Sequence, residues 1–340
     1  MQYRLTLTVC LLTAFAAERA DAQSYGRAPR PGKLGTDSEF ALRVDQKLGA
    51  SIPLDAQFHD HNGKEVTLGE LVGGKPTILV PAYYRCPKLC NEVLNGLLSG
   101  MRKMREQDST FTAGEAYNVI TFSIDAREAP ALANTKRAHY LREYDGREPN
   151  VPGWWFLTAS KGQGTNVAEA EKTIHEVTES IGYPFVVKYR GAEYQYQKNP
   201  ETGEGTWRDQ AGKAMKMDRS SFGHSDDYFH PAAVIILTPE GKISRYLLDV
   251  GFEPRTLRLA LVEASGGKVG TKVDQIALLC SSYDETTGHY KPAMIILAVV
   301  AAPFAFLVLG IAGYAWRKSR REKNSTELPP LGATEPPSAT

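Results

Sequence analysis

Two cysteines, Cys86 and Cys90, are the residues of this sequence whose type and spacing are best suited to chemistry. They follow an apolar, β-branched stretch, 76–80, and precede a stretch of helical spacing, so they lie where a buried strand meets a helix. The N-terminus of a helix carries partial positive charge, which favours thiolate over thiol. Residues four apart share one face of a helix, so two thiolates there can bind one soft ion or close into a disulfide.

The spacing of the pair leaves two kinds of site open. Redox dithiols usually have two intervening residues, whereas three separate Cys86 from Cys90, which weakens a purely redox role. A structural zinc site needs four ligands, and the sequence has no second closely spaced pair of cysteines. Two thiolates without that further pair suit Cu(I), because soft ligands select it.

A third ligand has to be a histidine from elsewhere in the chain. Five histidines are expected elsewhere. His59 and His61 flank a solvated turn, and His139 and His175 lie on exposed helix faces. His289 lies close to an uncharged segment, 293–315, that could span a membrane. His224 and His230 remain. His230 directly precedes an apolar strand at 232–237, and sites in α/β proteins gather at the ends of such strands. A buried histidine that only makes hydrogen bonds is the other interpretation, and these residues alone leave both open.

Strands and helices alternate around these residues, which predicts an α/β domain with a mixed sheet. An Asn62-Gly63 turn between short alternating runs predicts a hairpin. The predicted strands are 76–80, 117–124, 154–157, 232–237 and 242–247, and the predicted helices are 91–104, 132–144, 167–181 and 255–264. The polar stretch at about 186–222 has no clear periodicity and is predicted to be either a functional insertion or a flexible excursion.

Composition excludes several classes of protein. The 340 residues can form one large domain or two small ones, and the formal net charge of +1 gives no reason to expect nucleic acid as a partner. Four cysteines are too few for a disulfide-stapled scaffold. Cys10 lies in the first 22 residues, and Cys280 has no assigned role.

Both ends of the chain carry topological signals. Residues 1–22 have an early arginine, an apolar run and an Ala20-Asp21-Ala22 motif, the order of a secretory signal peptide. Residues 293–315 contain no charge and are long enough to span a bilayer as a helix. Basic residues follow at once, so the positive-inside rule places the C-terminus in the cytoplasm. We therefore expect a bacterial inner-membrane protein with one C-terminal transmembrane helix and its soluble body in the periplasm.

These signals divide the chain into successive parts. A signal peptide (1–22) and an entry segment (23–50) precede the main domain at 51–265, which contains the insertion. A juxtamembrane segment (266–292), the transmembrane helix (293–315) and a cytoplasmic tail (316–340) follow.

Several motifs resemble those of the SCO/SenC family. They are Tyr84-x-Cys86-Pro87-x-x-Cys90, Ser123-Ile124-Asp125, Gly153-Trp154-Trp155-Phe156-Leu157-Thr158, Gly241-Lys242-Ile243-Ser244-Arg245-Tyr246, and His230 nine residues before Pro239-Glu240-Gly241. The resemblance covers residues 57–270. It implies a thioredoxin-like fold in which two cysteines and one histidine bind Cu(I) or Cu(II). Carried over to this sequence, the copper ligands are Cys86, Cys90 and His230.

The resemblance also implies a function. Such proteins support copper insertion into the CuA centre of cytochrome c oxidase, so the expected partners are the copper-bearing oxidase subunit and other copper chaperones. A metallochaperone is not an enzyme. The alternative is a thiol–disulfide reductase that acts on the cysteines of a copper site, with Cys86 and Cys90 as its redox pair.

The sequence departs from the family pattern at several positions. The insertion is longer than the family norm and adds three residues with soft or imidazole ligands: Met215, Met217 and His224. These are either accessory ligands or part of a surface loop. Ala126 stands where the family often has proline, and Asp125 is expected either to contact metal or partner or to cap a loop. The C-terminal anchor is a further difference from mitochondrial members.

Overall fold

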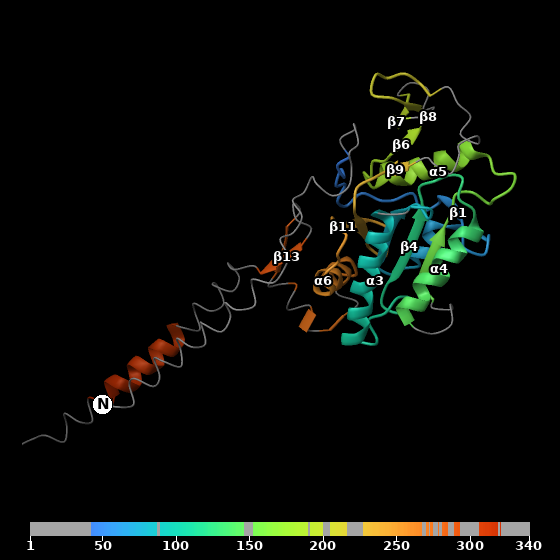
Figure 1. The fold of residues 1–340 in the computed structure, drawn as a ribbon. Helices are drawn as coiled ribbons and strands as arrows, with labels where there is room; N and C mark the ends of the chain where they lie inside the picture. The colour runs from blue at the N-terminus through green and yellow to red at the C-terminus, as the bar shows by residue number, and fades with distance from the viewer. Residues whose placement is uncertain are drawn as a thin grey trace, which may run out of the picture.

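The computed structural model describes residues 42–86, 89–145, 152–189, 191–199, 205–215 and 227–266, and shorter pieces between 270 and 320. A five-stranded sheet in the order β11-β10-β3-β4-β5 forms the centre of the fold (Figure 1). Its strands are β3 (Thr77–Ala82), β4 (Asn118–Ser123), β5 (Trp154–Leu157), β10 (Val234–Leu237) and β11 (Ile243–Leu247). The first three are parallel, and β10 is antiparallel to both of its neighbours.

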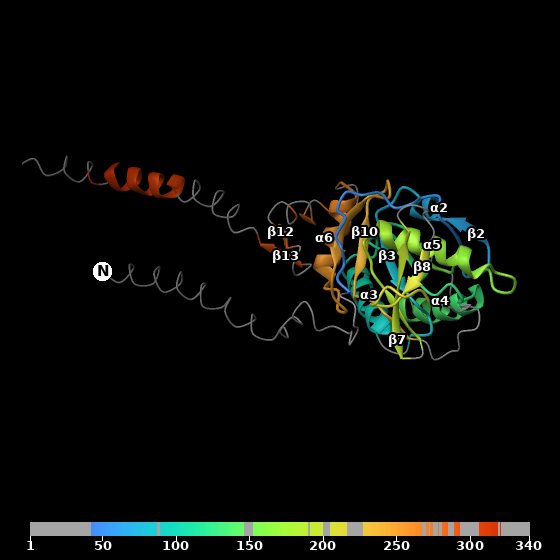
Figure 2. The same ribbon diagram turned by 90° about the horizontal axis from the view of Figure 1, so that it is seen from above.

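Helices cover one face of this sheet. Helix α3 (Leu89–Gln107) connects β3 to β4, and α4 (Pro130–Asp145) connects β4 to β5. Because crossovers between parallel strands are right-handed and both advance in the same direction, α3 and α4 lie on the same face. Helix α6 (Pro254–Ala264) packs against α3 and against β10 and β11 (Figures 1 and 2).

The loop before α6 crosses α3 at two glycines. A Cβ atom at Gly96 would lie 1.7 Å from the carbonyl oxygen of Val250, and one at Gly100 would lie 2.6 Å from that of Phe252. Any side chain at these positions would push the loop away, since backbone atoms block it. The glycines therefore let α6 pack closely against the helix that begins beside the cysteine pair.

The main elements agree with the prediction from periodicity. The five strands and four helices of the domain occur within a few residues of the predicted ranges, and the mixed α/β sheet is confirmed. The hairpin also forms, from β1 (Gln57–His59) and β2 (Glu65–Thr67). Its loop is longer than the two-residue turn that Asn62-Gly63 suggests, since the pairing ends at His59 and Glu65. The Asp60 carboxylate holds the loop by accepting hydrogen bonds from the backbone N–H groups of Asn62 and Lys64. The short helix α2 (Leu68–Val72), capped by Thr67 and Glu70, was not predicted.

The described residues of the insertion do not form an unstructured loop. Its residues form the greater part of a second, four-stranded antiparallel sheet in the order β8-β7-β6-β9. The strands are β6 (Val186–Tyr189), β7 (Ala192–Lys198), β8 (Gly205–Arg208) and β9 (Asp227–Phe229). Strands β7 and β8 have few fully buried residues and no regular alternation of buried and exposed positions, so single-sequence periodicity did not reveal them.

Helix α5 (Val167–Ser180) joins the second sheet to the rest of the domain (Figure 1). The imidazole of His175 lies flat between two aromatic rings, with ring centroids 3.6 Å from Tyr196 and 4.8 Å from Phe185. Trp207 packs edge-on against the imidazole and donates a hydrogen bond to Glu171. The expectation that His175 lies on an exposed face is therefore wrong, because the second sheet covers that face of α5.

Little of the C-terminal region is described. Strands β12 (Ser281–Asp284) and β13 (His289–Pro292) form a hairpin, and residues 306–318 are helical. Within the described part of the chain, no helix has the length and apolar character needed to cross a membrane. The signal-peptide prediction and most of the predicted span at 293–315 lie outside the described residues.

Candidate metal centre

The two cysteines lie where the buried strand β3 passes into helix α3, as predicted. Cys86 is in the loop that follows β3, and Cys90 is in the first turn of α3. The loop is anchored from within the core: the Tyr84 hydroxyl donates to the carbonyl of Leu157, 2.7 Å away, and lies 3.1 Å from that of Thr121. Two adjacent strands of the sheet therefore hold the residue two positions before Cys86.

A buried carboxylate holds the same loop from the other side. Glu128 accepts hydrogen bonds from the backbone N–H groups of Tyr84 (2.8 Å) and Arg85 (2.9 Å), and from the Ser123 hydroxyl (2.6 Å). Burial raises the pKa of Glu128 to about 7, and the nearby charge of Asp125 acts in the same direction, against these hydrogen bonds. Glu128 thus fixes the backbone leading into Cys86.

A third anchor comes from helices α3 and α4. The side-chain amide of Asn91 donates to the carbonyl of Cys86 at 3.0 Å, and the Lys136 ammonium donates to the oxygen of that amide at 2.9 Å. Asn91 follows Cys90 directly in the sequence, so this bond ties the cysteine loop back onto the first turn of its own helix. The Cys86 carbonyl is therefore held by Asn91 of α3, and the Asn91 side chain is in turn held by Lys136 of α4.

His230 reaches the cysteines through the topology of the two sheets. It directly follows β9, whose pairing with β6 places Phe229 opposite Val186. It precedes β10, which runs antiparallel to β3 with Ile235 opposite Leu79. The start of β10 therefore lies beside the end of β3, where the cysteine loop begins. The insertion thus has a structural role, since its sheet directs His230 to the centre.

The three side chains form one compact group. Nε2 of His230 lies 2.8 Å from Sγ of Cys90, and the ligand atoms of Cys86, Cys90 and His230 all lie within 4.8 Å of one another. All three residues are buried, and both cysteines are thiols in this structure. Among the described residues, this is the one group of cysteine, histidine and carboxylate ligands that satisfies such a distance limit.

The hydroxyl of Tyr183 determines which imidazole nitrogen faces the cysteines. It lies 2.7 Å from Nδ1 of His230 and donates to the carbonyl of Pro231, also at 2.7 Å. That carbonyl lies 3.0 Å from Nδ1 and can only accept. The arrangement is satisfied when Nδ1 carries the proton and donates it to Tyr183. Nε2 then presents its lone pair to Cys90, which is the state that binds metal.

Burial keeps both groups that flank the imidazole protonated. Burial raises the pKa of the Cys90 thiol well above its ordinary value, and the hydrogen bond and charge of Cys86 add to the effect. Burial likewise raises the pKa of Tyr183, with the charges of Cys90 and Cys86 as smaller causes. The expectation that a helix N-terminus favours the thiolate is therefore wrong for Cys90 without metal, because desolvation outweighs the helix dipole. A bound cation would replace the thiol proton.

Comparison with known proteins finds likeness in structure alone. The sequence matches no family model and no curated protein. Solved structures that resemble it include a proposed electron transfer protein of Aquifex aeolicus (22% identity, 65% of this chain and 96% of that one, TM-score 0.42). Others are copper-bound ScoI of Bradyrhizobium japonicum (21%, 64% and 98%, TM-score 0.34) and a SCO1/SenC family lipoprotein of Bacillus anthracis (14%, 66% and 98%, TM-score 0.38). The chain resembles SCO/SenC proteins.

None of the other candidates that the structure describes belongs to the group. His139 is exposed on α4, and Met215 is partly buried against the hydrophobic core. Asp125 is buried and binds Arg127 through its Nε at 2.8 Å and its backbone N–H at 3.0 Å, which fits the loop-capping interpretation. Three further candidates, Met217, His224 and Cys280, lie outside the described residues.

Sequence reasoning missed the residues that support the centre. Tyr183, Glu128 and Asn91 make the contacts described above, and none lies in a sequence motif that identifies it as part of a site. Tyr183 stands 47 positions before His230, so only the folded chain brings them together. A weak signal existed for Asn91, because a polar residue beside Cys90 in a first helical turn is well placed to bond the preceding loop.

Proposed function

We propose that this protein is a metallochaperone that binds one copper ion through Cys86, Cys90 and His230. The observation that carries the proposal is the 2.8 Å approach of His230 Nε2 to Cys90 Sγ inside a buried group of three ligands. The imidazole tautomer supports it, since the lone pair faces the thiol. Two thiolates and one imidazole form a soft ligand set that suits Cu(I).

Other metals fit the described group less well. A structural zinc site is closed by four protein ligands, and the group supplies three. Calcium and magnesium prefer oxygen ligands, which the group lacks. Iron–sulfur clusters are usually held by more cysteines than two. Copper is therefore the metal that this ligand set supports best.

The burial of the ligands supports transfer by direct exchange. Cys86 is 6% exposed, and Cys90 and His230 are each 2% exposed, so an ion held there has little contact with water. Release would then require a partner whose own ligands replace these one at a time. On the sequence resemblance to SCO/SenC proteins, we propose the copper-bearing subunit of cytochrome c oxidase as the recipient and its CuA centre as the destination.

The place of action is part of the proposal. The signal-peptide pattern of residues 1–22 and the uncharged run at 293–315 support export of the body and retention by a C-terminal membrane helix. We propose that the domain faces the bacterial periplasm, with the basic residues after position 315 on the cytoplasmic side. Other copper chaperones that load the site are a second class of partner.

A thiol–disulfide reductase is the alternative function. It is favoured by the closeness of the Cys86 and Cys90 sulfur atoms, which lie within the 4.8 Å group. The raised pKa of Cys90 opposes it, because an attacking thiol reacts as the thiolate. His230 also serves no required role in such a reaction, whereas a metal site uses it as a ligand.

The test is a copper titration of the reduced full-length chain in detergent. Competition with a Cu(I) chelator is expected to show one equivalent bound in the wild type and strongly weakened binding in Cys86→Ser, Cys90→Ser and His230→Ala. His139→Ala, at an exposed histidine of α4, is the matched control and should bind as the wild type does. One tightly held equivalent that persists unchanged in His230→Ala would refute the site.

A further inference from the structure

An exposed arginine stands directly beside one ligand of the metal centre. Arg85 precedes Cys86, and its guanidinium makes no hydrogen bond or ion pair with any described residue. The backbone of Arg85 is fixed, because its N–H donates to the buried Glu128 carboxylate at 2.9 Å. A cation without a partner in the described structure is thus held at a defined point of the cysteine loop.

Cys86 is also the most accessible of the three ligands. It is 6% exposed, whereas Cys90 and His230 are each 2% exposed. The sulfur of Cys90 is enclosed, since it accepts the backbone N–H of Tyr83 at 3.5 Å and lies 2.8 Å from Nε2 of His230. The ligand that a partner meets first is therefore the one beside Arg85.

The charges around the cysteine loop are sorted by depth. The acidic groups are buried: Glu128 is 0% exposed, and the Asp125 side chain is 3% exposed and paired with Arg127. The basic groups lie nearer the surface, since Arg85 is exposed, Lys136 is half-buried and the Arg127 side chain is 16% exposed. With both carboxylates ionised these five residues carry a net positive charge, and the cations are the outer ones.

Two acidic residues of the surrounding surface do not cancel this charge. Glu92 is exposed on α3, but it follows Cys90 by two positions, and residues two apart do not share a face of a helix. Asp249 accepts the backbone N–H of Val250, whose carbonyl lies against Gly96, about 9 Å further along α3 than Cys90. Neither carboxylate pairs with the Arg85 guanidinium.

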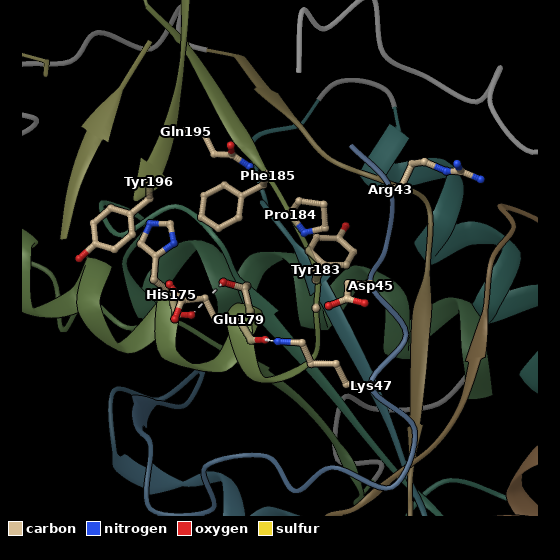
Figure 3. Close-up of a pocket in the computed structure, with 12 residues that line it drawn as sticks. Arg43, Asp45, Lys47, His175, Glu179, Tyr183, Pro184, Phe185, Gln195 and Tyr196 are labelled. Atoms are coloured by element: carbon tan, nitrogen blue, oxygen red, sulfur yellow. Dashed lines mark hydrogen bonds between the residues drawn. The ribbon is translucent and has the colours of Figure 1, made fainter. Parts of the chain in front are cut away.

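The other side of the centre has no such excess of one charge. Tyr183, whose hydroxyl contacts Nδ1 of His230, lines a pocket of about 250 Å³ between α5, β7 and the stretch that leads into the domain (Figure 3). Two basic and two acidic residues line the same pocket: Arg43, Lys47, Asp45 and Glu179. The charge that could select a partner therefore lies at the cysteine loop.

We propose that the partner that exchanges copper with this protein presents an anionic face to Cys86, and that Arg85 attracts and orients that face. A Cu(I) ion held by two thiolates carries a net negative charge, so an acceptor with thiolate or carboxylate groups is repelled by the loaded centre. A cation beside the most accessible ligand offsets that repulsion and raises the rate of productive encounter. The partner half of the inference rests on the proposed function, whereas the positive potential at Cys86 does not.

The potential at Cys86 is measured without copper, on the reduced full-length chain in detergent. Iodoacetate and iodoacetamide alkylate the same thiolate and are nearly equal in size, but only iodoacetate carries a negative charge. The ratio of their rates at Cys86, assigned by peptide mapping, therefore reports the local potential and cancels the ionisation of the thiol itself. At low salt we expect this ratio to exceed that of an acetylated cysteine amide in solution by about two- to fivefold.

Two matched variants test the source of this potential. Arg85→Gln should lower the ratio to that of the cysteine amide. Arg102→Gln removes an exposed arginine about 18 Å along α3 from Cys90 and should keep the ratio of the wild type. A wild-type ratio no higher than the reference, or one unchanged in Arg85→Gln, overturns the proposal. A Cys86 that reacts with neither reagent in the folded chain refutes its role as the accessible ligand.

The partner half is tested by the rate of Cu(I) transfer to two short dithiol peptides. The peptides are identical except that glutamates flank the cysteines in one and lysines in the other. At low salt the wild type should deliver copper to the glutamate peptide about tenfold faster. Arg85→Gln should lose most of that preference and Arg102→Gln should keep it, and comparing variants cancels any intrinsic difference between the peptides.

Two results of the transfer experiment refute the partner half. They are a preference for the lysine peptide in the wild type, and a preference for the glutamate peptide that Arg85→Gln leaves unchanged. If the wild type binds no copper, the proposed function fails, while the alkylation ratio still decides whether Arg85 makes the surface at Cys86 positive.

Discussion

Nε2 of His230 lies 2.8 Å from Sγ of Cys90, although 140 positions separate the two residues in the sequence. The approach depends on two strand pairings, β6 with β9 and β3 with β10. The loop between β9 and β10 therefore brings the histidine to the N-terminal turn of α3. The side chains that hold this geometry lead to four predictions.

The first prediction concerns the hydroxyl that orients the imidazole. Tyr183→Phe should lower Cu(I) affinity about 10- to 100-fold, the usual effect of losing the partner of a ligating histidine. The free energy of unfolding should fall by about 1–3 kcal/mol, because the hydroxyl makes two buried hydrogen bonds whose partners are left unpaired. Tyr144→Phe also removes a buried hydroxyl, which bonds Thr112, and should leave copper affinity unchanged. Equal losses of affinity in both variants would show that His230 does not depend on Tyr183.

A second prediction concerns Glu128 and pH. Its pKa is raised from 4.5 to about 7 in the folded protein, so the folded state holds the proton more tightly than the unfolded one. The contribution of Glu128 to the free energy of unfolding is therefore complete below pH 4.5 and is lost as the pH rises through 7. At 1.36 kcal/mol per pKa unit, the loss is about 3 kcal/mol.

The measurement is urea unfolding between pH 4.5 and 8. Glu128→Gln cannot ionise, so the difference in stability between the wild type and this variant should change by about 3 kcal/mol across that range. Glu65→Gln, at an exposed carboxylate of β2, provides the comparison. A constant difference between wild type and Glu128→Gln would show that Glu128 titrates normally.

The third prediction tests the anchor on the Cys86 carbonyl. Asn91→Leu keeps the volume but leaves that carbonyl and the Lys136 ammonium without their partner. Copper affinity should fall about tenfold, equivalent to about 1.4 kcal/mol. Asn95→Leu, one turn further along α3, removes a bond to Tyr140 instead and should leave copper affinity near that of the wild type. Chelator competition on both proteins decides the point.

A fourth prediction concerns the second sheet as the support of His230. Trp207→Ala removes the ring that packs on His175 and Phe185, with a cost of about 3–5 kcal/mol typical of a buried tryptophan. Amide hydrogen exchange should accelerate in β6 and β9, and copper affinity should fall, although Trp207 touches no ligand. Trp155→Ala, in the main sheet, should not accelerate exchange in β6 and β9. If amide exchange in β6 and β9 is unchanged in Trp207→Ala, the packing of Trp207 does not support His230 through the second sheet.

The sequence predicted those parts of the fold whose pattern is local. Strands such as β3 and β4 are buried on both faces, and α3 has one apolar face, so composition and spacing reveal them. The cysteine pair could be placed at a strand–helix junction for the same reason. The second sheet was not predicted, because its strands are short and partly exposed. Strands β6, β7 and β8 pair with their neighbours in sequence, and only the pairing of β6 with β9 joins distant segments.

By itself, the sequence determined that Cys86 and Cys90 share one site, because residues four positions apart in a helix or a turn lie close together in any fold. The sequence also determined that this pair offers sulfur ligands, because the cysteines are read directly from it. The residues alone left His230 open, and the resemblance to SCO/SenC proteins named it. Its position beside Cys90, the proton on its Nδ1 and the protonated Cys90 were decided only by tertiary structure. All three depend on burial and on contacts between residues far apart in the chain, and neither quantity exists before the sheets have assembled.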